Sequence, residues 1–311
     1  MKNLGLTVSS IILGLIFVPV LINQFKENET RKFQGTSLSE TNYEEVKFTN
    51  EEQNLSLSGL LLIPKGEGPF PAVVMIHGSG SSKRDNIWYL TLATYLQHNE
   101  ILVLLPDKRG SDQSEGSWRT SGFGDLASDA IAAVEYLKSQ NTYAILNLGV
   151  IGLSQGGQIA PIAANKCSDI DFVVNICGAA VPMYEQLLYE ETNNLKEIGF
   201  LPVISAVLAR LTTYYHINIG KNKEFWETIG NFNSIEHWGK IKVNVFVLYG
   251  EHDTNTPTKE SAQKLKALNK SNIYLKIYND SGHALEDPIY AGNNIFRNDA
   301  LADIKEFIIS Q

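Results

Sequence analysis

The chain has 311 residues, of which 43% are hydrophobic and 19% are charged, an ordinary globular composition that excludes a disordered, collagen-like or coiled-coil protein. Acidic residues outnumber basic ones by 34 to 26, and the resulting net charge of −8 argues against a nucleic-acid partner. Two cysteines are too few for a disulfide framework, and no paired Cys/His spacing predicts structural zinc.

The first 22 residues have the pattern of a targeting or anchoring segment. A short positive head, residues 1–3, precedes residues 4–22, which carry no charge and are mostly apolar. This pattern predicts a cleaved signal peptide or an uncleaved signal anchor, with a buried first helix of the fold as the alternative. Residues 23–42 are polar and predict a tether. We therefore expect an exported protein of the cell envelope, either anchored in the membrane or secreted.

From residue 43 onward, short apolar runs alternate with helical patterns. Strands are expected at residues 44–48, 55–63, 72–76, 101–105, 148–153, 172–176, 243–249 and 273–278. Helices are expected at residues 87–98, 125–139, 159–165, 258–268 and 299–309. Continuous apolar runs are typical of strands that are buried on both faces. The alternation predicts an α/β fold with a mostly parallel central sheet and helices on both faces.

One connection is far longer than a loop between a strand and a helix needs. Residues 182–240 separate two expected strands and predict helices at 183–198, 203–215 and 223–229. Such an insertion predicts a helical lid, about residues 183–238 of a domain spanning 43–311, that covers a site. Its nine aromatic residues favour an apolar acyl pocket. A structural elaboration that never contacts substrate is the alternative.

The sharpest local signal is a serine in a glycine-rich turn. Residues 152–156 read G-L-S-Q-G, with an expected strand before them and an expected helix after them. This context fits the G-x-S-x-G turn, in which the serine oxygen stands at the end of a strand as a nucleophile. The pattern therefore predicts Ser154 as the nucleophile, and the alternative is a turn with an idle serine.

A nucleophilic serine needs a base and an acid that orients the base. The chain order nucleophile, acid, base predicts them in the loops after the last two strands. His283 lies in the loop after the final strand, and Asp253 follows the strand before it. Asp253 would orient the His283 imidazole and stabilise its charged form, and Glu251 is the alternative acid.

Two backbone N–H groups are expected to stabilise the negative charge on the reacting oxygen. Residues 77–80 read H-G-S-G directly after an expected strand, where one donor is needed, and Gln155 follows the nucleophile. We expect the N–H groups of Ser79 and Gln155 to form this oxyanion hole. His77 is then a hydrogen-bonded structural residue.

In this order of motifs, the chain resembles the α/β-hydrolase superfamily over residues 43–311. The segments D-K-R-G-S-D-Q-S-E-G at 107–116 and S-Q-G-G-Q-I-A-P at 154–161 are most similar to bacterial single-domain esterases related to dipeptidyl aminopeptidase/acylaminoacyl-peptidase-like hydrolases. The resemblance implies a catalytic triad of Ser154, Asp253 and His283 and carboxylic-ester hydrolysis. Asp112 departs from it, because many relatives have Gly there. We expect no cofactor and no metal.

The sequence therefore predicts a serine hydrolase that cleaves a small-molecule ester or acyl substrate through an acyl-enzyme. Peptidase, amidase or thioesterase activity of the same triad is the alternative, because the leaving group is chosen by the pocket. A non-catalytic binding module on this fold is the other class considered, and it would leave the complete triad unexplained. Contact with a membrane is expected only through the N-terminal segment.

Overall fold

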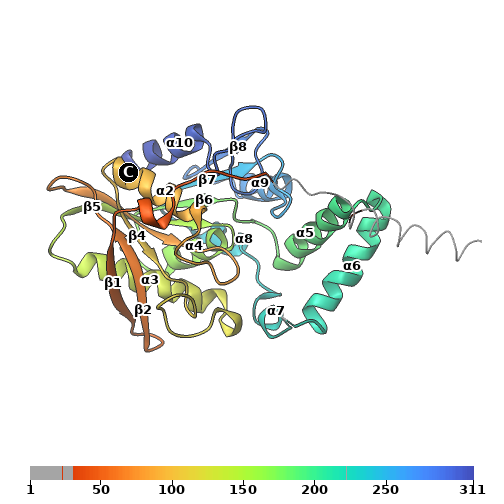
Figure 1. The fold of residues 1–311 in the computed structure, drawn as a ribbon. Helices are drawn as coiled ribbons and strands as arrows, with labels where there is room; N and C mark the ends of the chain where they lie inside the picture. Colours follow the sequence, from red (N-terminus) through yellow and green to blue (C-terminus); the bar gives the residue numbers. More distant parts are fainter. Residues whose placement is uncertain (1–22, 24–30, 222) are drawn as a thin grey trace, which may run out of the picture.

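The computed structural model describes residue 23, residues 31–221 and residues 223–311, and in this part of the chain an eight-stranded sheet forms the centre (Figure 1). The strands are β1 (Glu44–Asn50), β2 (Leu55–Leu62), β3 (Phe70–Ile76), β4 (Leu102–Pro106), β5 (Ile145–Leu153), β6 (Phe172–Ile176), β7 (Asn244–Gly250) and β8 (Ile273–Tyr278). Their spatial order is β1-β2-β4-β3-β5-β6-β7-β8. β2 runs antiparallel to both neighbours, and all other pairs are parallel. The expected mostly parallel sheet is confirmed.

Helices cover both faces of this sheet. The flanking helices are α2 (Ile87–His98), α3 (Phe123–Ser139), α4 (Gln155–Lys166), α9 (Thr258–Ala267) and α10 (Asn298–Ile309). Buried side chains of α3 and α4 form one hydrophobic cluster with the sheet, and those of α2 and α10 form a second cluster on the opposite face. The molecule is therefore a three-layer α/β protein, as the sequence predicts.

The central strands show why their sequences are continuously apolar. In β5, Val150 belongs to the cluster with α3 and α4, whereas its neighbour Ile151 belongs to the cluster with α2 and α10. Successive side chains of a strand point to opposite faces, so every position of a doubly covered strand is buried and must be apolar. Ser154 and Asp253 lie in the turns that follow two of these apolar strands, β5 and β7.

The long connection between β6 and β7 is helical. It contains α5 (Met183–Ile198), α6 (Pro202–Asn218), α7 (Lys223–Ile229) and α8 (Ile235–Lys240). α5, α6 and α7 stand beside the sheet layers (Figure 1). The last of the four, α8, was not expected from the sequence because it is only six residues long. It nevertheless packs on α4 and α9 and buries Trp238 completely.

The N-terminal part of the described chain lies against the domain. The Gln34 N–H donates to the carbonyl of Asn293, and the Ile295 N–H donates to the carbonyl of Gln34. Residues 31–42, within the expected tether, also include the short 3₁₀ helix η1 (Leu38–Glu40), and a second, η2 (Trp118–Thr120), precedes α3. Residues 1–22, the predicted signal peptide or anchor, lie outside the described residues. None of the described helices is long and apolar enough to cross a membrane.

Candidate active site

Ser154 stands in a strained turn between β5 and α4. Its backbone has φ 54° and ψ −120°, a region that non-glycine residues adopt rarely and at an energetic cost. The glycines on either side of this turn are required because backbone atoms approach them too closely to leave room for a side chain. A Cβ on Gly152 would lie 2.2 Å from the carbonyl oxygen of Gly156, and one on Gly156 would lie 2.0 Å from that of Ile76. The G-x-S-x-G pattern is therefore a packing requirement of this strand-to-helix turn.

The three residues expected as a triad lie in one row. The Nε2 atom of His283 is 2.9 Å from the Oγ of Ser154, and its Nδ1 is 2.8 Å from Oδ2 of Asp253. Asp253 follows β7, and His283 lies in the loop after β8. The Asp253 side chain is fully buried, and the His283 side chain is 22% exposed. The side chains expected from the sequence thus meet at hydrogen-bonding distance.

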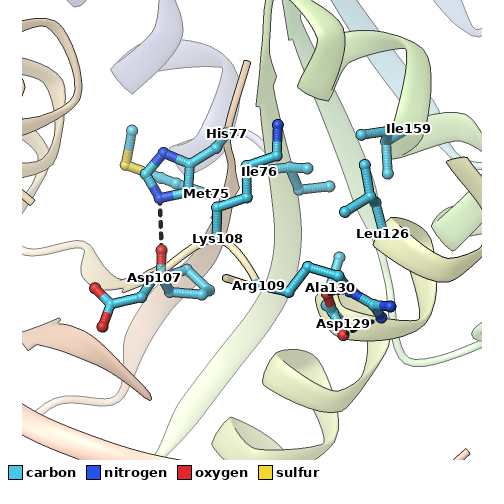
Figure 2. A pocket seen from close by; sticks show the side chains of 11 residues that line it. Met75, Ile76, His77, Asp107, Lys108, Arg109, Leu126, Asp129, Ala130 and Ile159 are labelled. Atoms are coloured by element: carbon cyan, nitrogen blue, oxygen red, sulfur yellow. Dashed lines mark hydrogen bonds and ion pairs between the residues drawn. The ribbon is translucent and has the colours of Figure 1, made fainter. Parts of the chain in front are cut away.

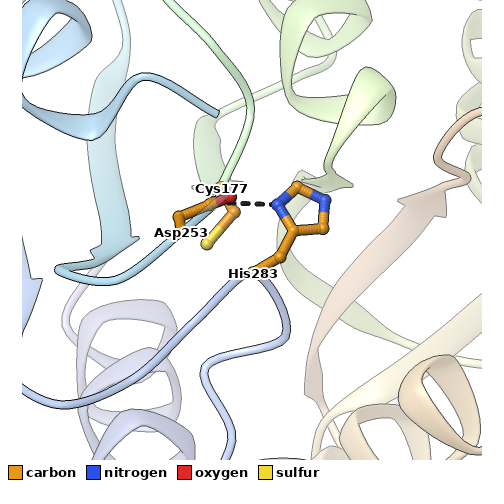
Figure 3. Close-up of side chains that lie close together, drawn as sticks. All are labelled: Cys177, Asp253 and His283. Carbon is orange, nitrogen blue, oxygen red and sulfur yellow. Dashed lines mark hydrogen bonds and ion pairs between the residues drawn. The ribbon is translucent and has the colours of Figure 1, made fainter. Parts of the chain in front are cut away.

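Backbone groups hold the Asp253 carboxylate in place. Its second oxygen, Oδ1, accepts the N–H groups of Asn255 and Thr256, each at 2.8 Å. Oδ2 is thereby left to face Nδ1 of His283 (Figure 3). A carboxylate can only accept here, so Nδ1 carries the proton and Nε2 is left to accept the hydroxyl proton of Ser154.

The electrostatics of this row favour a charged imidazole. Burial lowers the pKa of His283, but the Asp253 carboxylate more than offsets this effect and the net pKa is raised above its ordinary value, with Glu190 and Glu286 contributing to the rise. A base with a raised pKa takes a proton from a serine hydroxyl more readily. Glu251, the alternative acid, is exposed, and its carboxylate accepts the N–H of Asp280. Among the described residues it makes no hydrogen bond or ion pair with His283.

The expected oxyanion donors open onto the same space as the serine. Ser79 and Gln155 line one cavity together with Ser154. Within the described residues, neither backbone N–H donates a hydrogen bond, so both remain available to a ligand. Gln155 is also the first residue of α4, and the positive end of this helix dipole favours negative charge at that point.

A buried lysine links the two segments that carry these donors. The Nζ of Lys108 donates to the carbonyl of Gly78 at 2.5 Å and to Oε1 of Gln155 at 3.0 Å. Lys108 is only 6% exposed, and burial lowers its pKa to about 7. It ties the loop after β3 to the first turn of α4.

His77 is a structural residue, as expected. Its Nε2 donates to the carbonyl of Pro106 at 2.5 Å, and burial lowers its pKa to about 4, which keeps the ring neutral. Arg109 forms an ion pair with Asp129, 2.6 Å between Nε and Oδ2. His77 and Arg109 line a small cavity of about 40 Å³ (Figure 2). Ser154 does not border this cavity.

The cavity beside Ser154 has a volume of about 240 Å³. Its walls come from the loops, from α4, and from the inserted helices α5, α6 and α7. The lining residues are Ser79, Ser154, Gln155, Gln158, Met183, Gln186, Leu187, Glu190, Glu191, His216, Phe225, Trp226 and Asn255. Of the nine aromatic residues of the insertion, only Phe225 and Trp226 are among them. The cavity is therefore more polar than the apolar acyl pocket that the sequence suggested.

Two groups of side chains in the described residues have the composition of a metal site. Cys177, Asp253 and His283 approach one another within 4.8 Å, as do the exposed Glu251, His252 and Asp280. In the first group the His283 and Asp253 atoms already bond each other, and burial raises the pKa of the Cys177 thiol well above its ordinary value, which favours a protonated, weakly ligating sulfur (Figure 3). Both cysteines are free and buried. The chemistry of the first group therefore does not favour a metal.

The sheet order, the flanking helices and the serine turn after β5 define an α/β-hydrolase. More specifically, the chain belongs to the family described as BAAT / acyl-CoA thioester hydrolase C terminal, whose model matches residues 131–301, more than half of the sequence. This membership confirms the resemblance drawn from the motifs and makes the protein a hydrolase.

Known relatives are similar over most of the chain. Esterase EstD from Thermotoga maritima is 24% identical over 288 residues, which are 86% of this chain and 69% of that protein. The solved structure of an esterase from Pyrococcus furiosus superposes with a TM-score of 0.62 at 21% identity, covering 90% of this chain and 96% of that one. Est1E from Butyrivibrio proteoclasticus, solved with ferulic acid bound, has a TM-score of 0.63 at 17% identity, covering 86% and 98%. The two structures support the fold.

Three residues around the site were not singled out from the sequence. Lys108 and Gln158 belong to the two segments that carry the family resemblance, which assigns no role to either residue. Gln158 on α4 and Glu190 on α5 line the same cavity, and α5 is joined to α4 by the hydrogen bond between Gln158 and Gln186. For Lys108 the sequence did offer a signal, because this lysine follows an expected buried strand and Asp107. The sequence pattern of a helix does not state what the helix covers, so the other two carried no signal.

Proposed function

We propose that the protein is a serine hydrolase that cleaves carboxylic esters of small molecules through an acyl-enzyme. The observation that carries the proposal is the row of hydrogen bonds from Ser154 through His283 to Asp253, at 2.9 and 2.8 Å. The similarity of the chain to esterase EstD, which extends over 86% of its length, supports an ester as the substrate class.

In the first half-reaction, the Ser154 Oγ attacks the ester carbonyl carbon while Nε2 of His283 takes the hydroxyl proton. The carbonyl oxygen becomes an oxyanion, which the N–H groups of Ser79 and Gln155 stabilise. Asp253 keeps Nδ1 protonated and stabilises the imidazolium. His283 then donates its proton to the leaving alcohol as the bond between carbonyl carbon and alcohol oxygen breaks.

In the second half-reaction, water replaces the alcohol. Neutral His283 takes a proton from water, whose oxygen attacks the acyl carbon of the Ser154 ester. The oxyanion forms again in the same hole. His283 then returns the proton to Oγ, the carboxylic acid leaves, and the residues regain their starting protonation states.

Thioester hydrolysis is the second candidate, because the description of the matched family names acyl-CoA thioesters. The chemistry at Ser154 would be the same, with a thiol leaving in place of an alcohol. The cavity residues disfavour the coenzyme itself. Its phosphates call for Arg or Lys, whereas the described residues that line the cavity include two glutamates and no Arg or Lys.

A label that reacts only with activated serines tests the proposal. We expect a fluorophosphonate to modify Ser154 and to abolish hydrolysis of p-nitrophenyl esters. Ser154→Ala should retain the circular dichroism spectrum and lose at least about 10³-fold in kcat, since some catalysis by the oxyanion hole survives removal of the triad. A folded Ser154→Ala protein with full turnover would contradict the proposal. Parallel assays of matched esters and thioesters separate the two candidates.

A further inference from the structure

The wall of the cavity beside Ser154 carries a buried acceptor without a donor. Gln158 lies on α4, one turn after Ser154, is fully buried and lines the cavity. Its Nε2 donates to Oε1 of Gln186 on α5. Its own Oε1 is buried and has no hydrogen-bond partner among the described residues. An unpaired buried acceptor is costly, so this atom indicates a ligand that brings a donor.

Two carboxylates from α5 face the same space. Glu190 is partly buried and lines the cavity, as does Glu191, whose side chain is 16% exposed. Glu191 has one weak partner, with 3.6 Å between its Oε1 and Nε2 of His216. Glu190 has no ion-pair or hydrogen-bond partner among the described residues. Burial raises the pKa of its carboxyl, as does neighbouring Glu191, whereas His283 lowers it.

The remaining wall suits a cation as well. Phe225 and Trp226 line the cavity, with their ring centroids 5.2 Å apart. The faces of aromatic rings attract ammonium groups. No lysine or arginine is among the described lining residues, so nothing of fixed positive charge offsets the glutamates.

We propose that this cavity is a recognition site for an ammonium group on the substrate, with Glu190 and Glu191 as its charge partners and Gln158 as an acceptor for one of its N–H bonds. Substrates of the proposed esterase would then be esters that carry a protonated amine a few bonds from the scissile carbonyl. The inference rests on the proposed function, because it takes the space beside Ser154 as substrate space.

The charge balance favours an ammonium over two other ligand classes. An anionic acyl group would meet Glu190 and Glu191 at close range, where like charges repel. A neutral polyol could donate to Gln158 and stack on Trp226, but it would leave the Glu190 charge uncompensated in a partly buried place. A primary ammonium supplies both the donors and the charge.

Matched pairs of esters test this inference. On the acyl side, p-nitrophenyl esters of β-alanine and ε-aminohexanoic acid are compared with butyrate and heptanoate, in which a methyl group replaces the ammonium. On the alcohol side, choline butyrate is compared with its neutral carbon isostere, dimethylbutyl butyrate. All are assayed at one neutral pH and low salt. For at least one pair we expect kcat/KM to be about 10- to 100-fold higher for the cation, the range of a charge-assisted contact.

Variants assign the effect to the cavity. Glu190→Gln should reduce the ratio of cationic to neutral kcat/KM by about tenfold, and the ratio cancels any common effect on His283. Glu197→Gln is the matched control, because Glu197 is an exposed glutamate on the same helix that does not line the cavity. It should leave the ratio unchanged. Gln158→Leu should lower the ratio for the primary ammonium esters more than for choline, which has no N–H.

A binding measurement separates this inference from the proposed function. Calorimetry on full-length Ser154→Ala should detect binding of butylammonium but not of butanol, and the double variant with Glu190→Gln should lose that binding. If wild type hydrolyses no ester and Ser154 resists the fluorophosphonate, the proposed function fails and calorimetry alone decides the inference. Equal rates within every pair, a ratio insensitive to Glu190→Gln, or a preference for acetylated sugars would overturn the ammonium site.

Discussion

Asp253→Asn tests the row of hydrogen bonds from Ser154 through His283 to Asp253, because it should change which ring nitrogen of His283 carries the proton. In the protein, Oδ1 of Asp253 already accepts the N–H groups of Asn255 and Thr256 at 2.8 Å. An asparagine must keep its oxygen on these donors, so its NH₂ group turns towards Nδ1 of His283. Nδ1 then has to accept, the proton moves to Nε2, and the imidazole can no longer take the proton of Ser154.

The size of the effect follows from this wrong tautomer. A comparable change in a serine triad lowers kcat by about 10⁴-fold, which corresponds to about 5.4 kcal/mol of transition-state stabilisation. KM should change much less, because Asp253 is fully buried behind His283 and does not line the cavity. The fold should survive, since asparagine is isosteric and keeps the bonds to both backbone N–H groups.

The assay is p-nitrophenyl ester hydrolysis, with kcat and KM measured separately and folding checked by thermal unfolding. Glu251→Gln is the matched control, because it removes the same charge from an exposed site two residues away, and its kcat should stay close to that of wild type. A folded Asp253→Asn protein that keeps more than about a tenth of the wild-type kcat would refute the role of Asp253 as the acid that orients His283. That role is also refuted if Glu251→Gln loses as much activity as Asp253→Asn.

Three further predictions concern charged groups near the site. Glu190→Gln removes one of the carboxylates that raise the pKa of His283, so the acid limb of the kcat profile should shift to lower pH; Glu197→Gln should not move it, and an unshifted limb in Glu190→Gln would show that the two groups do not interact. Lys108→Met removes the hydrogen bonds from Nζ to the Gly78 carbonyl and to Gln155, which link the segments of the two proposed oxyanion donors. It should lower kcat by about 10- to 100-fold with little change in KM. Burial in the folded protein lowers the pKa of Lys108 from 10.5 to about 7. The free energy of unfolding of the wild type should therefore rise relative to that of Lys108→Met as the pH rises from about 7 to 10.5. A difference in unfolding free energy that stays constant over this range would contradict the lowered pKa of Lys108.

The strands were predictable because burial on both faces leaves a plain signal. β6 (Phe172–Ile176), which is buried at every position, begins and ends where the sequence predicts. β8 (Ile273–Tyr278) also matches its prediction, although it is an edge strand in which only Tyr278 is buried. α4 was predicted to begin at residue 159 but begins at Gln155. Its first turn contains Gly156 and Gly157, which are poor helix formers. Their presence reflects the close approach of Ile76 and Asn175, a tertiary contact that helix propensity does not record.

The candidate site also contains one part that the sequence predicts and one part that it does not. Ser154, Asp253 and His283 could be predicted because each follows its own strand, and parallel strands end at a common edge of the sheet. The polar character of the cavity beside Ser154 could not be predicted. Its character depends on which face of α5 turns inward, and the aromatic content of the insertion pointed to an apolar pocket. Most of those aromatic residues lie away from Ser154, and Glu190 lies beside it.

The contacts of α5 argue against regarding the insertion as a detachable cover. Tyr189 donates its hydroxyl proton to the carbonyl of Asp253 at 2.8 Å, and Asn193 donates to the carbonyl of Thr254 at 3.0 Å. Gln186, on the same helix face, accepts from Gln158. Spacings of three and four residues place these side chains and Glu190 on one side of the helix. The helix that holds the Asp253 loop therefore also presents the Glu190 carboxylate to the cavity beside Ser154. If this cavity binds the substrate as proposed, a substitution on this face of α5 acts on the orientation of His283 and on selectivity together.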